Sequence, residues 1–287
     1  MAIKLNKHSQ DISTERTPLW IDAWEYGREL FLKGNSPPWE DIAAFVAYHK
    51  KLQGLIKSDF VVVELECFYD NWLQRHPALL DAMSAKKRVG YSMRTLLADD
   101  ASRNQIREIV DALADCYGDL PLVLSVPSPK NWLEISHCQA HGVDAVNINW
   151  EQAESGSMYM ADYLRNFATC NLSGLLLKDT ENEGPASDDE LAHYQPVLNV
   201  AQHYRWQVVS DGCEMNYMPS AESGLTYFTN TQPQAEACLK FSLDSWPPTT
   251  PPPFNGLGFW YLTVQKGMVP ESTLDALAAI SAHGSKN

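Results

Sequence analysis

Short apolar runs alternate with longer segments of helical periodicity from residue 59 to the end of the chain. The runs have the length and the β-branched content of buried strands. Most of the segments between them place apolar residues three and four positions apart, as one face of a helix requires. The expected strands cover residues 59–66, 88–93, 121–127, 144–150, 173–179, 206–212, 225–230 and 256–264.

Eight strands that alternate with helices at intervals of about 30 residues predict a parallel sheet. The number eight favours a closed (β/α)8 barrel, the TIM barrel, over an open doubly wound sheet. No G-x-G-x-x-G or P-loop sequence follows a strand, so the fingerprints of dinucleotide and nucleotide binding are missing. We therefore predict an α/β protein with an N-terminal helical extension, residues 1–58, that caps a barrel formed by residues 59–287.

Two further segments are expected to be helical. The first is residues 17–30, TPLWIDAWEYGREL, and a second helix follows it before residue 58. The other is residues 232–242, QPQAEACLKFS. A glycine in the first segment weakens a helix by about 1 kcal/mol, so helix propensity does not explain this composition. The segment either packs against the end of a large core or lines a pocket.

The composition indicates a cytoplasmic protein. The chain has 287 residues, 45% of them hydrophobic, and its apolar runs are far shorter than the ~20 residues of a membrane span. Its first residues are polar and contain no apolar core of a signal peptide. Six cysteines lie far apart without a C-x-x-C pair, which is typical of reduced thiols.

The formal net charge of −14 argues against nucleic acid as a partner, because such proteins need a basic surface. It does not argue against a small-molecule site, where a few local cations can dominate the field. The proline-rich residues 246–256 run into an aromatic segment that ends near residue 260. We expect this region to form an apolar contact between two copies of the chain in a homodimer.

Active sites of (β/α)8 barrels lie at the carboxyl ends of the strands. Glu64 and Glu66 alternate on one expected strand and therefore share a face. Two carboxylates there would raise the pKa of one of them, as a general acid requires. Asn147, Asn149 and Glu151 repeat this spacing on the fourth expected strand, where the amides would orient a substrate and the carboxylate would act as acid or base. Interior hydrogen bonding is the alternative role of the two asparagines.

Lys178 and Asp179 end the fifth expected strand, and alternation directs only one of them inward. A desolvated lysine could form a Schiff base, but no second aldolase feature accompanies it. We expect Asp179 to act in the pocket and Lys178 to contact the substrate. Tyr91, Arg94 and Asp211 stand at other strand ends as further substrate-binding residues.

The opening segment brings Trp20, Trp24 and Tyr26 close to Arg28. Aromatic rings beside a guanidinium could form a pocket in which the arginine binds a carboxylate. The alternative is that Arg28 pairs with a carboxylate on its own helix. The sequence leaves both readings open.

Four segments resemble the superfamily of uroporphyrinogen decarboxylase and cobalamin-independent methionine synthase. In the first, a Pro-x-Trp motif precedes a Gly-Arg pair, as in the N-terminal signature of the decarboxylases. The second, residues 58–66, resembles the first barrel strand of that family, which ends in a catalytic aspartate. The other two are residues 159–179 and residues 256–280, which resemble strands of the wider superfamily. The matching residues of the first segment are Thr17, Pro18, Trp20, Gly27 and Arg28.

The resemblance implies a barrel in which Arg28 belongs to the substrate pocket and Glu66 takes the place of a catalytic aspartate. Trp24 stands where the family has its first pocket arginine, and Glu66 is one methylene longer than aspartate. These departures argue against a tetrapyrrole substrate. We expect a metal-free lyase or decarboxylase that acts on a small carboxylated compound, aromatic or heterocyclic. Glu66 would protonate the carbanion, and Asn149 and Tyr91 would orient the substrate.

Two alternatives remain at this stage. One is a zinc-dependent methyltransferase, with Cys213 and nearby carboxylates as ligands, and the other is a barrel that only binds a ligand or partner. His137 and His141 share a helix face and could chelate zinc, but they end a helix, away from the strand ends where the active site is expected.

Overall fold

The computed structural model describes residues 2–180, 183–212, 225–229, 237–243 and 258–283. Eight strands form one sheet in the order β1-β8-β7-β6-β5-β4-β3-β2, and every pair of neighbours is parallel. The sheet is the barrel of a (β/α)8 fold, as predicted. Its strands are β1 Leu19–Asp22, β2 Val61–Glu64, β3 Leu122–Pro127, β4 Gly174–Lys178, β5 Gln207–Asp211, β6 Leu225–Thr229, β7 Ala237–Ser242 and β8 Trp260–Thr263.

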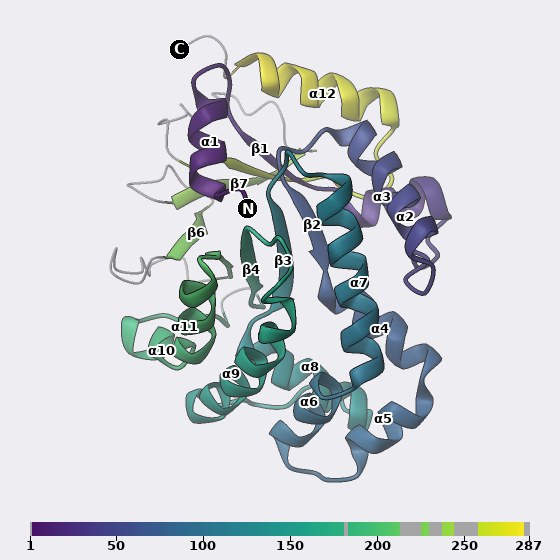
Figure 1. Cartoon of the computed structure of the whole chain (residues 1–287), viewed down its shortest axis with the longest axis vertical. Coiled ribbons are helices and arrows are strands. Elements are labelled where there is room, and N and C mark those ends of the chain that lie inside the picture. Colours follow the sequence, from purple (N-terminus) through teal and green to yellow (C-terminus); the bar gives the residue numbers. More distant parts are fainter. Residues whose placement is uncertain (1, 181–182, 213–224, 230–236, 244–257, 284–287) are drawn as a thin grey trace.

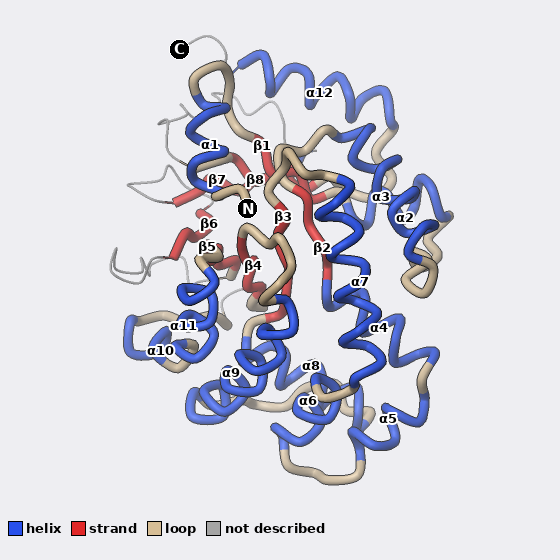
Figure 2. The backbone as a smooth tube through the Cα atoms, in the orientation of Figure 1, coloured by secondary structure: helices blue, strands red, loops and turns tan. Residues whose placement is uncertain are grey.

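The helices are distributed unevenly around this sheet (Figures 1 and 2). Several helices that precede or follow β2, β3 and β4 gather beyond the carboxyl ends of these strands: α4, α5, α6, α8 and α9. Within the described ranges, no helix combines the length and the apolar character needed to cross a bilayer. The helices are α1 Leu5–Ser13, α2 Trp24–Leu32, α3 Ile42–Ile56, α4 Leu65–Arg75, α5 Pro77–Ser84, α6 Val89–Leu97, α7 Asp100–Cys116, α8 Pro129–His141, α9 Trp150–Leu164, α10 Asp188–Ala192, α11 Gln195–Tyr204 and α12 Pro270–His283.

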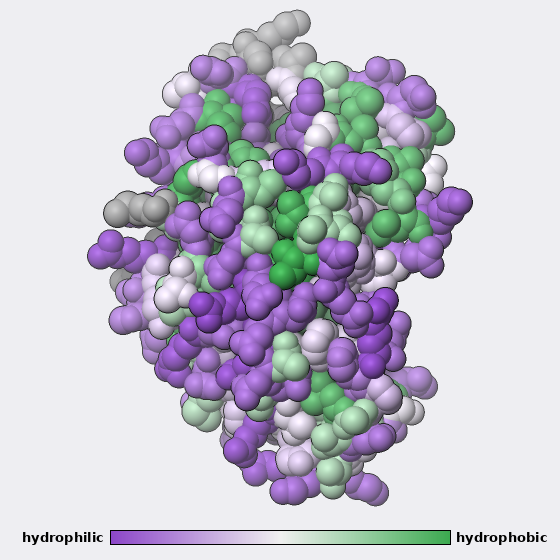
Figure 3. Space-filling view, turned by 45° about the vertical axis from the view of Figure 1, so that its right-hand side comes forward, coloured by the Kyte–Doolittle hydropathy of each residue, from purple (hydrophilic) through white to green (hydrophobic). Residues whose placement is uncertain are grey.

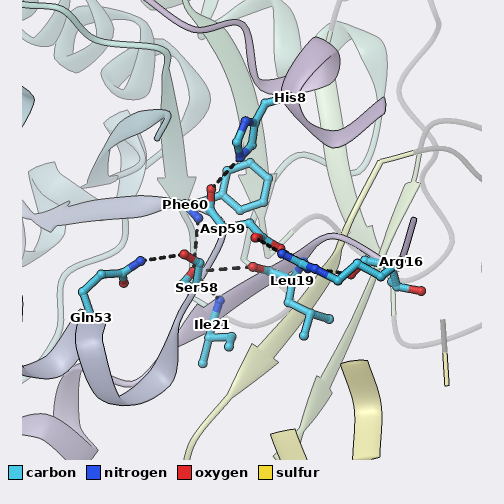
Figure 4. A network of polar contacts seen from close by, with 9 residues as sticks. His8, Arg16, Leu19, Ile21, Gln53, Ser58, Asp59 and Phe60 are labelled. Carbon is cyan, nitrogen blue, oxygen red and sulfur yellow. Dashed lines mark hydrogen bonds and ion pairs between the residues drawn. The ribbon is translucent and has the colours of Figure 1, made fainter. Parts of the chain in front are cut away.

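One backbone hydrogen bond and several side-chain contacts, rather than a full ladder, join the two ends of the sheet between β1 and β2 (Figure 4). The Asp59 N–H donates to the Leu19 carbonyl at 2.9 Å, and the Asp59 carboxylate accepts from the Leu19 N–H at 2.8 Å. Arg16 holds the same carboxylate with two nitrogens. Ser58 Oγ accepts from the Ile21 N–H at 3.0 Å. This seam closes the amino end of the barrel.

Apolar side chains fill the barrel and separate its two ends. Trp20 stacks on Phe60 with ring centroids 5.1 Å apart, and Leu5 from α1 joins the same cluster with no exposed surface. Gly174 lies at this amino end, where a Cβ atom would clash with the Gln207 carbonyl and with Leu5. The full cluster is Leu5, Trp20, Phe60, Val123, Leu176, Val209, Phe259 and Tyr261.

Hydrophilic residues cover most of the face shown in Figure 3, and hydrophobic ones are grouped mainly in its upper part. The exposed large apolar side chains are scattered over the fold: Leu30, Val143, Met158, Val269 and Leu274. The homodimer contact expected at residues 246–260 falls almost entirely outside the described residues.

Six of the eight expected strands are confirmed, and two are wrong. Residues 88–93 belong to helix α6, and residues 144–149 form an irregular segment that caps α9. Two strands were instead expected as helices. Residues 17–30 contain β1 before α2, so the predicted cap of residues 1–58 carries a barrel strand, and residues 237–242 form β7.

Candidate functional site

Charged and polar side chains form a layer above the apolar barrel interior, at the carboxyl ends of the strands. Alternation along each strand directs these side chains to the same side as the interior cluster. The register pairs Lys178 with Asp211, and Lys240 with Tyr261. We call this layer the mouth. Its residues are Asp22, Glu64, Ser125, Lys178, Asp211, Lys240 and Tyr261.

Lys178 lies between two carboxylates of the mouth. Its Nζ is 3.1 Å from both oxygens of Glu64 and 4.0 Å from Asp22 Oδ2. Burial alone would lower the pKa of Lys178, but the negative charges of Glu64 and Asp22 raise it above its ordinary value. Lys178 is therefore an ammonium ion at neutral pH, which supports charge stabilisation rather than Schiff-base formation.

Lys240 forms a second ion pair across the mouth. Its Nζ is 2.6 Å and 2.8 Å from the two oxygens of Asp211 and lies 5.6 Å from the centre of the Tyr261 ring. The Tyr261 hydroxyl donates to Asp22 Oδ2 at 2.8 Å. Burial, followed by the charge of Asp22, raises the pKa of Tyr261, so it stays protonated. The side chain of Lys240 is 34% exposed and can be reached from outside.

The floor and one wall of the mouth have room for further polar contacts. Ser125 is 1% exposed, and its Oγ has no hydrogen-bond partner among the described residues. A cavity of about 40 Å³ lies between β1, β2 and α3, and its lining includes Asp22, Glu64 and Trp24. This volume is large enough for a water molecule.

A separate buried cluster surrounds Asp179, which follows β4. Ser128 donates to Asp179 Oδ1, and the Tyr194 hydroxyl reaches the same oxygen at 3.1 Å. Burial raises the pKa of Asp179 to about 6, although these two hydrogen bonds act in the opposite direction. Its second oxygen, Oδ2, is buried with no partner among the described residues. Asp179 thus lies outside the charged layer of the mouth.

Glu66 lies in the first turn of α4, immediately after β2. Burial is the main cause of its raised pKa, and the charge of Asp70 adds to the effect. Glu66 is two residues beyond Glu64, the mouth residue that ends β2, but it lies on a helix and therefore does not share a strand face with Glu64 as expected. A carboxyl group in this setting keeps its proton to a higher pH than an exposed glutamate does.

The aromatic and arginine pocket expected from residues 17–30 does not form. Arg28 binds Glu25 at 2.8 Å and the Gly34 carbonyl at 2.9 Å, so it pairs on its own helix and the following turn. Trp24 and Tyr26 are buried in the main core, and Trp20 lies inside the barrel. These side chains are therefore packing residues, although Trp20 and Trp24 also line the cavity that Asp22 and Glu64 line.

Five other expected site residues lie on helices or loops rather than at strand ends. Tyr91 and Arg94 belong to α6, and Arg94 is exposed. Asn149 is the N-cap of α9 in a capping box, which explains its side chain without a substrate. Asn147 and Glu151 are exposed on either side of it. Both roles expected for the two asparagines inside the barrel, orienting a substrate and interior hydrogen bonding, are therefore wrong.

Sequence reasoning placed Glu64, Lys178 and Asp211 at the mouth but missed three of their neighbours. Asp22 and Lys240 lie in segments that were expected to be helical. Tyr261 could have been found, because it alternates with Phe259 along the last strand. The described residues contain no group of three metal-binding side chains, and Cys213 lies outside these residues.

No model of a known protein family and no curated protein matches the chain. Two similar solved structures are 2,3-dimethylmalate lyase, a PEP mutase/isocitrate lyase superfamily member, and a protein assigned as a phosphonomutase from Burkholderia cenocepacia J2315. The match to the lyase spans 82% of this chain and 83% of the lyase chain, with 9% sequence identity and a TM-score of 0.33. The match to the second structure spans 97% of this chain and 99% of the other chain, with 10% sequence identity and a TM-score of 0.32.

These findings correct the expected membership of the uroporphyrinogen decarboxylase and methionine synthase superfamily. No family model matches the chain, so none supports that superfamily. The residue that carried the resemblance, Arg28, binds its own helix and turn instead of facing the mouth. Similarity at these TM-scores says nothing about activity, so the function has to be inferred from the mouth.

Proposed function

We propose that the chain is a lyase that breaks a carbon–carbon bond in a small carboxylated substrate held at the mouth. The observation that carries the proposal is the pair of lysine ammonium groups, Lys178 and Lys240, which carboxylates and a phenol from four other strands surround. Breaking a bond beside a carboxylate or carbonyl group leaves an electron pair on carbon. Fixed positive charge in a partly buried site stabilises such a developing anion.

The two lysines have different surroundings and therefore different proposed roles. Lys240 is the more exposed, 34% against 25% for Lys178, and we assign it the substrate carboxylate. Lys178 lies deeper, against Glu64, and would stabilise the enolate oxygen that forms when the bond breaks. The Tyr261 hydroxyl fixes the orientation of Asp22, which faces the same ammonium group.

Glu66 is the proposed proton donor. Its raised pKa keeps a fraction of the carboxyl groups protonated where ordinary glutamates are ionised. When the carbon–carbon bond breaks, its electron pair stays on the carbon beside the carboxylate or carbonyl group, and the other carbon leaves as a carbonyl compound whose hydroxyl proton passes to water. The carbanion takes the proton from Glu66, and Glu66 regains a proton from water. This step leaves the lysines charged throughout, so they act only by electrostatics.

The position of the tryptophans changes the expected substrate. The aromatic wall that suggested an aromatic or heterocyclic compound is buried in the core. The mouth presents ammonium, carboxylate and hydroxyl groups instead. A compact, polar carboxylic acid with a carbonyl or hydroxyl group fits this environment better than a flat apolar ring.

The test compares two mouth variants with a surface control. The purified chain is incubated with a panel of small 2-oxo, 2-hydroxy and dicarboxylic acids, and fragments are quantified by NMR. We expect Lys178→Met to lower kcat about 100-fold or more, because it removes the charge beside the developing anion. We expect Lys240→Met mainly to raise KM, and Lys50→Met, an exposed change on α3, to have no effect.

Two results would contradict the proposal. One is full turnover by Lys178→Met with unchanged folding, since the charge would then be irrelevant to the reaction. The other is that wild type binds carboxylic acids of the panel and that Lys178→Met and Lys240→Met bind them as tightly as wild type does. A lack of cleavage together with lysine-dependent binding would instead show a barrel that binds such acids without acting as a lyase.

A further inference from the structure

A pair of histidines at the end of α8 is unexplained by the proposed lyase site. His137 and His141 are one turn apart, and their ring centroids are 4.4 Å apart. Each ring has one nitrogen, His137 Nδ1 and His141 Nε2, that is buried with no hydrogen-bond partner among the described residues. Buried polar atoms normally have a partner, so this pair calls for a reason.

We propose that His137 and His141 form a binding site for a divalent transition-metal ion of the zinc, nickel or copper class. Histidines at positions i and i+4 present their rings on the same helix face, which is the spacing that two-histidine zinc motifs use. Imidazole nitrogen is a ligand that all three of these ions accept. The proposal does not depend on the lyase reaction.

The separation of the rings fits shared coordination. Metal–nitrogen bonds to histidine are about 2.0–2.1 Å long, so two imidazoles on adjacent coordination positions of one ion have centroids roughly 4.5–5 Å apart. The observed 4.4 Å needs only a small adjustment. The two orphaned nitrogens would then be satisfied by the same ion.

The neighbouring side chains limit the site to two protein ligands. No group of three His, Cys, Asp or Glu side chains that could hold a metal occurs in the part of the chain that the structure describes. Cys138 lies between the histidines in sequence, but its thiol completes no such group. Water would fill the remaining positions, so we expect an exchangeable ion rather than a closed structural centre.

The position on α8 separates this site from the mouth. The helix begins at Pro129, two residues after β3 ends, and His137 lies eight residues further on. At 1.5 Å per residue, the pair lies about 12–18 Å along the helix from the carboxyl end of β3. An ion here would link the last two turns of α8 and stabilise the helices beyond the barrel, without touching a bound substrate.

Calorimetric titration of the full chain, free of any purification tag, with Ni²⁺ tests the proposal. We expect one ion per chain and at least tenfold weaker binding in His137→Ala and in His141→Ala. Ni²⁺ should raise the melting temperature of wild type and of His203→Ala, but not that of these two variants. His203→Ala is the matched control, because His203 also ends a helix but has no histidine one turn away. Zn²⁺ should bind at the same residues.

Three outcomes would overturn the proposal. The first is that wild type does not bind Ni²⁺ or Zn²⁺ at all. The second is that His137→Ala and His141→Ala bind as tightly as wild type. The third is that binding is lost in Cys138→Ser but kept in the histidine variants, since the thiol would then be the ligand. Circular dichroism of each variant checks that α8 is still folded when binding is measured.

Discussion

Neighbouring charges decide what a partly buried lysine at the mouth can do. Desolvation favours a neutral amine, which would be a nucleophile, whereas two carboxylates within 4.0 Å favour the ammonium ion. For Lys178 the charges prevail, and its pKa is raised. The same residue in an apolar barrel would suit Schiff-base chemistry, so its partners, rather than its position at a strand end, determine the role.

The protonation state of Glu66 should control the rate of the proposed reaction. Burial raises its pKa above the ordinary 4.5, so the protonated form that donates to the carbanion is lost as the pH rises through that raised value. We expect kcat to fall about tenfold per pH unit above it, and Glu66→Gln to lower kcat by 10²–10⁴-fold and remove this pH dependence. Glu151→Gln, an exposed change, should reproduce the wild-type profile. Wild-type rates in Glu66→Gln would assign the proton donor elsewhere.

Asp179 makes folding stability depend on pH. Its pKa is about 6 in the folded protein against an ordinary 3.8, so the folded state holds the proton to higher pH. The stability it contributes is fully present below about pH 3.8 and is lost as the pH rises through 6. We expect Asp179→Asn, which resembles the protonated acid, to gain stability relative to wild type between pH 4.5 and 7.5.

The gain should approach about 3 kcal/mol at most, from 1.36 kcal/mol per pKa unit. Urea unfolding of both proteins at pH 4.5 and pH 7.5 measures it, with Asp115→Asn, an exposed change on α7, as the control. The same difference between wild type and Asp179→Asn at both pH values would show that the carboxylate is ionised throughout this range.

At the scale of elements, short strands explain most of what the sequence failed to predict. β1 has four residues and runs into α2 after a single residue, so a window long enough to detect periodicity mixes the two. Residues 88–93 show the opposite error. Met93 is buried and Val89 partly buried where α6 packs against α8 and α9, and a short apolar run does not distinguish such packing from burial in a sheet.

The seam between β1 and β2 depends on the hydrogen bonds that Ser58 accepts. Ser58 Oγ accepts hydrogen bonds from two backbone N–H groups, those of Ile21 and Phe60, the second at 3.3 Å. Ser58 is buried. Ser58→Ala leaves these donors without that acceptor, so we expect a loss of about 1–3 kcal/mol in the free energy of unfolding. Chemical denaturation measures the loss.

Ser84→Ala is the matched control, because the Ser84 hydroxyl is exposed and donates only to the Asp81 carbonyl within its own helix. Hydrogen exchange at the Ile21 amide adds a local readout and should become faster in Ser58→Ala. Equal stability and equal exchange in the two variants would mean that the seam does not depend on this serine.

For the whole molecule, the barrel could be predicted although two of the eight strands were assigned wrongly. The predicted number of strands was still eight, because two segments were wrongly expected as strands and two real strands were missed. The site was more sensitive. Glu64, Lys178 and Asp211 follow correctly assigned strands, whereas Asp22 and Lys240, their partners, depend on the strands that were missed.

The amino end of the barrel carries the last prediction. Leu5 has no exposed surface and closes the interior that the mouth residues stand on, and Gly174 leaves the space that Leu5 occupies. We expect Leu5→Ala to cost about 2–5 kcal/mol, as large-to-small changes in cores do. Gly174→Ala should cost more, because its Cβ would also clash with the rigid Gln207 carbonyl.

Gly54→Ala is the control for the glycine change, because nothing lies within 4 Å of its Cβ position in α3, and it should stabilise the protein by up to about 1 kcal/mol. Combining Leu5→Ala with Gly174→Ala removes one of the two clashes, so the double variant should lose less than the sum of the single losses. Strictly additive losses would show that α1 does not close the barrel. Because the mouth lies at the opposite end of the strands, the lysine-dependent binding of carboxylic acids should persist in every variant that folds.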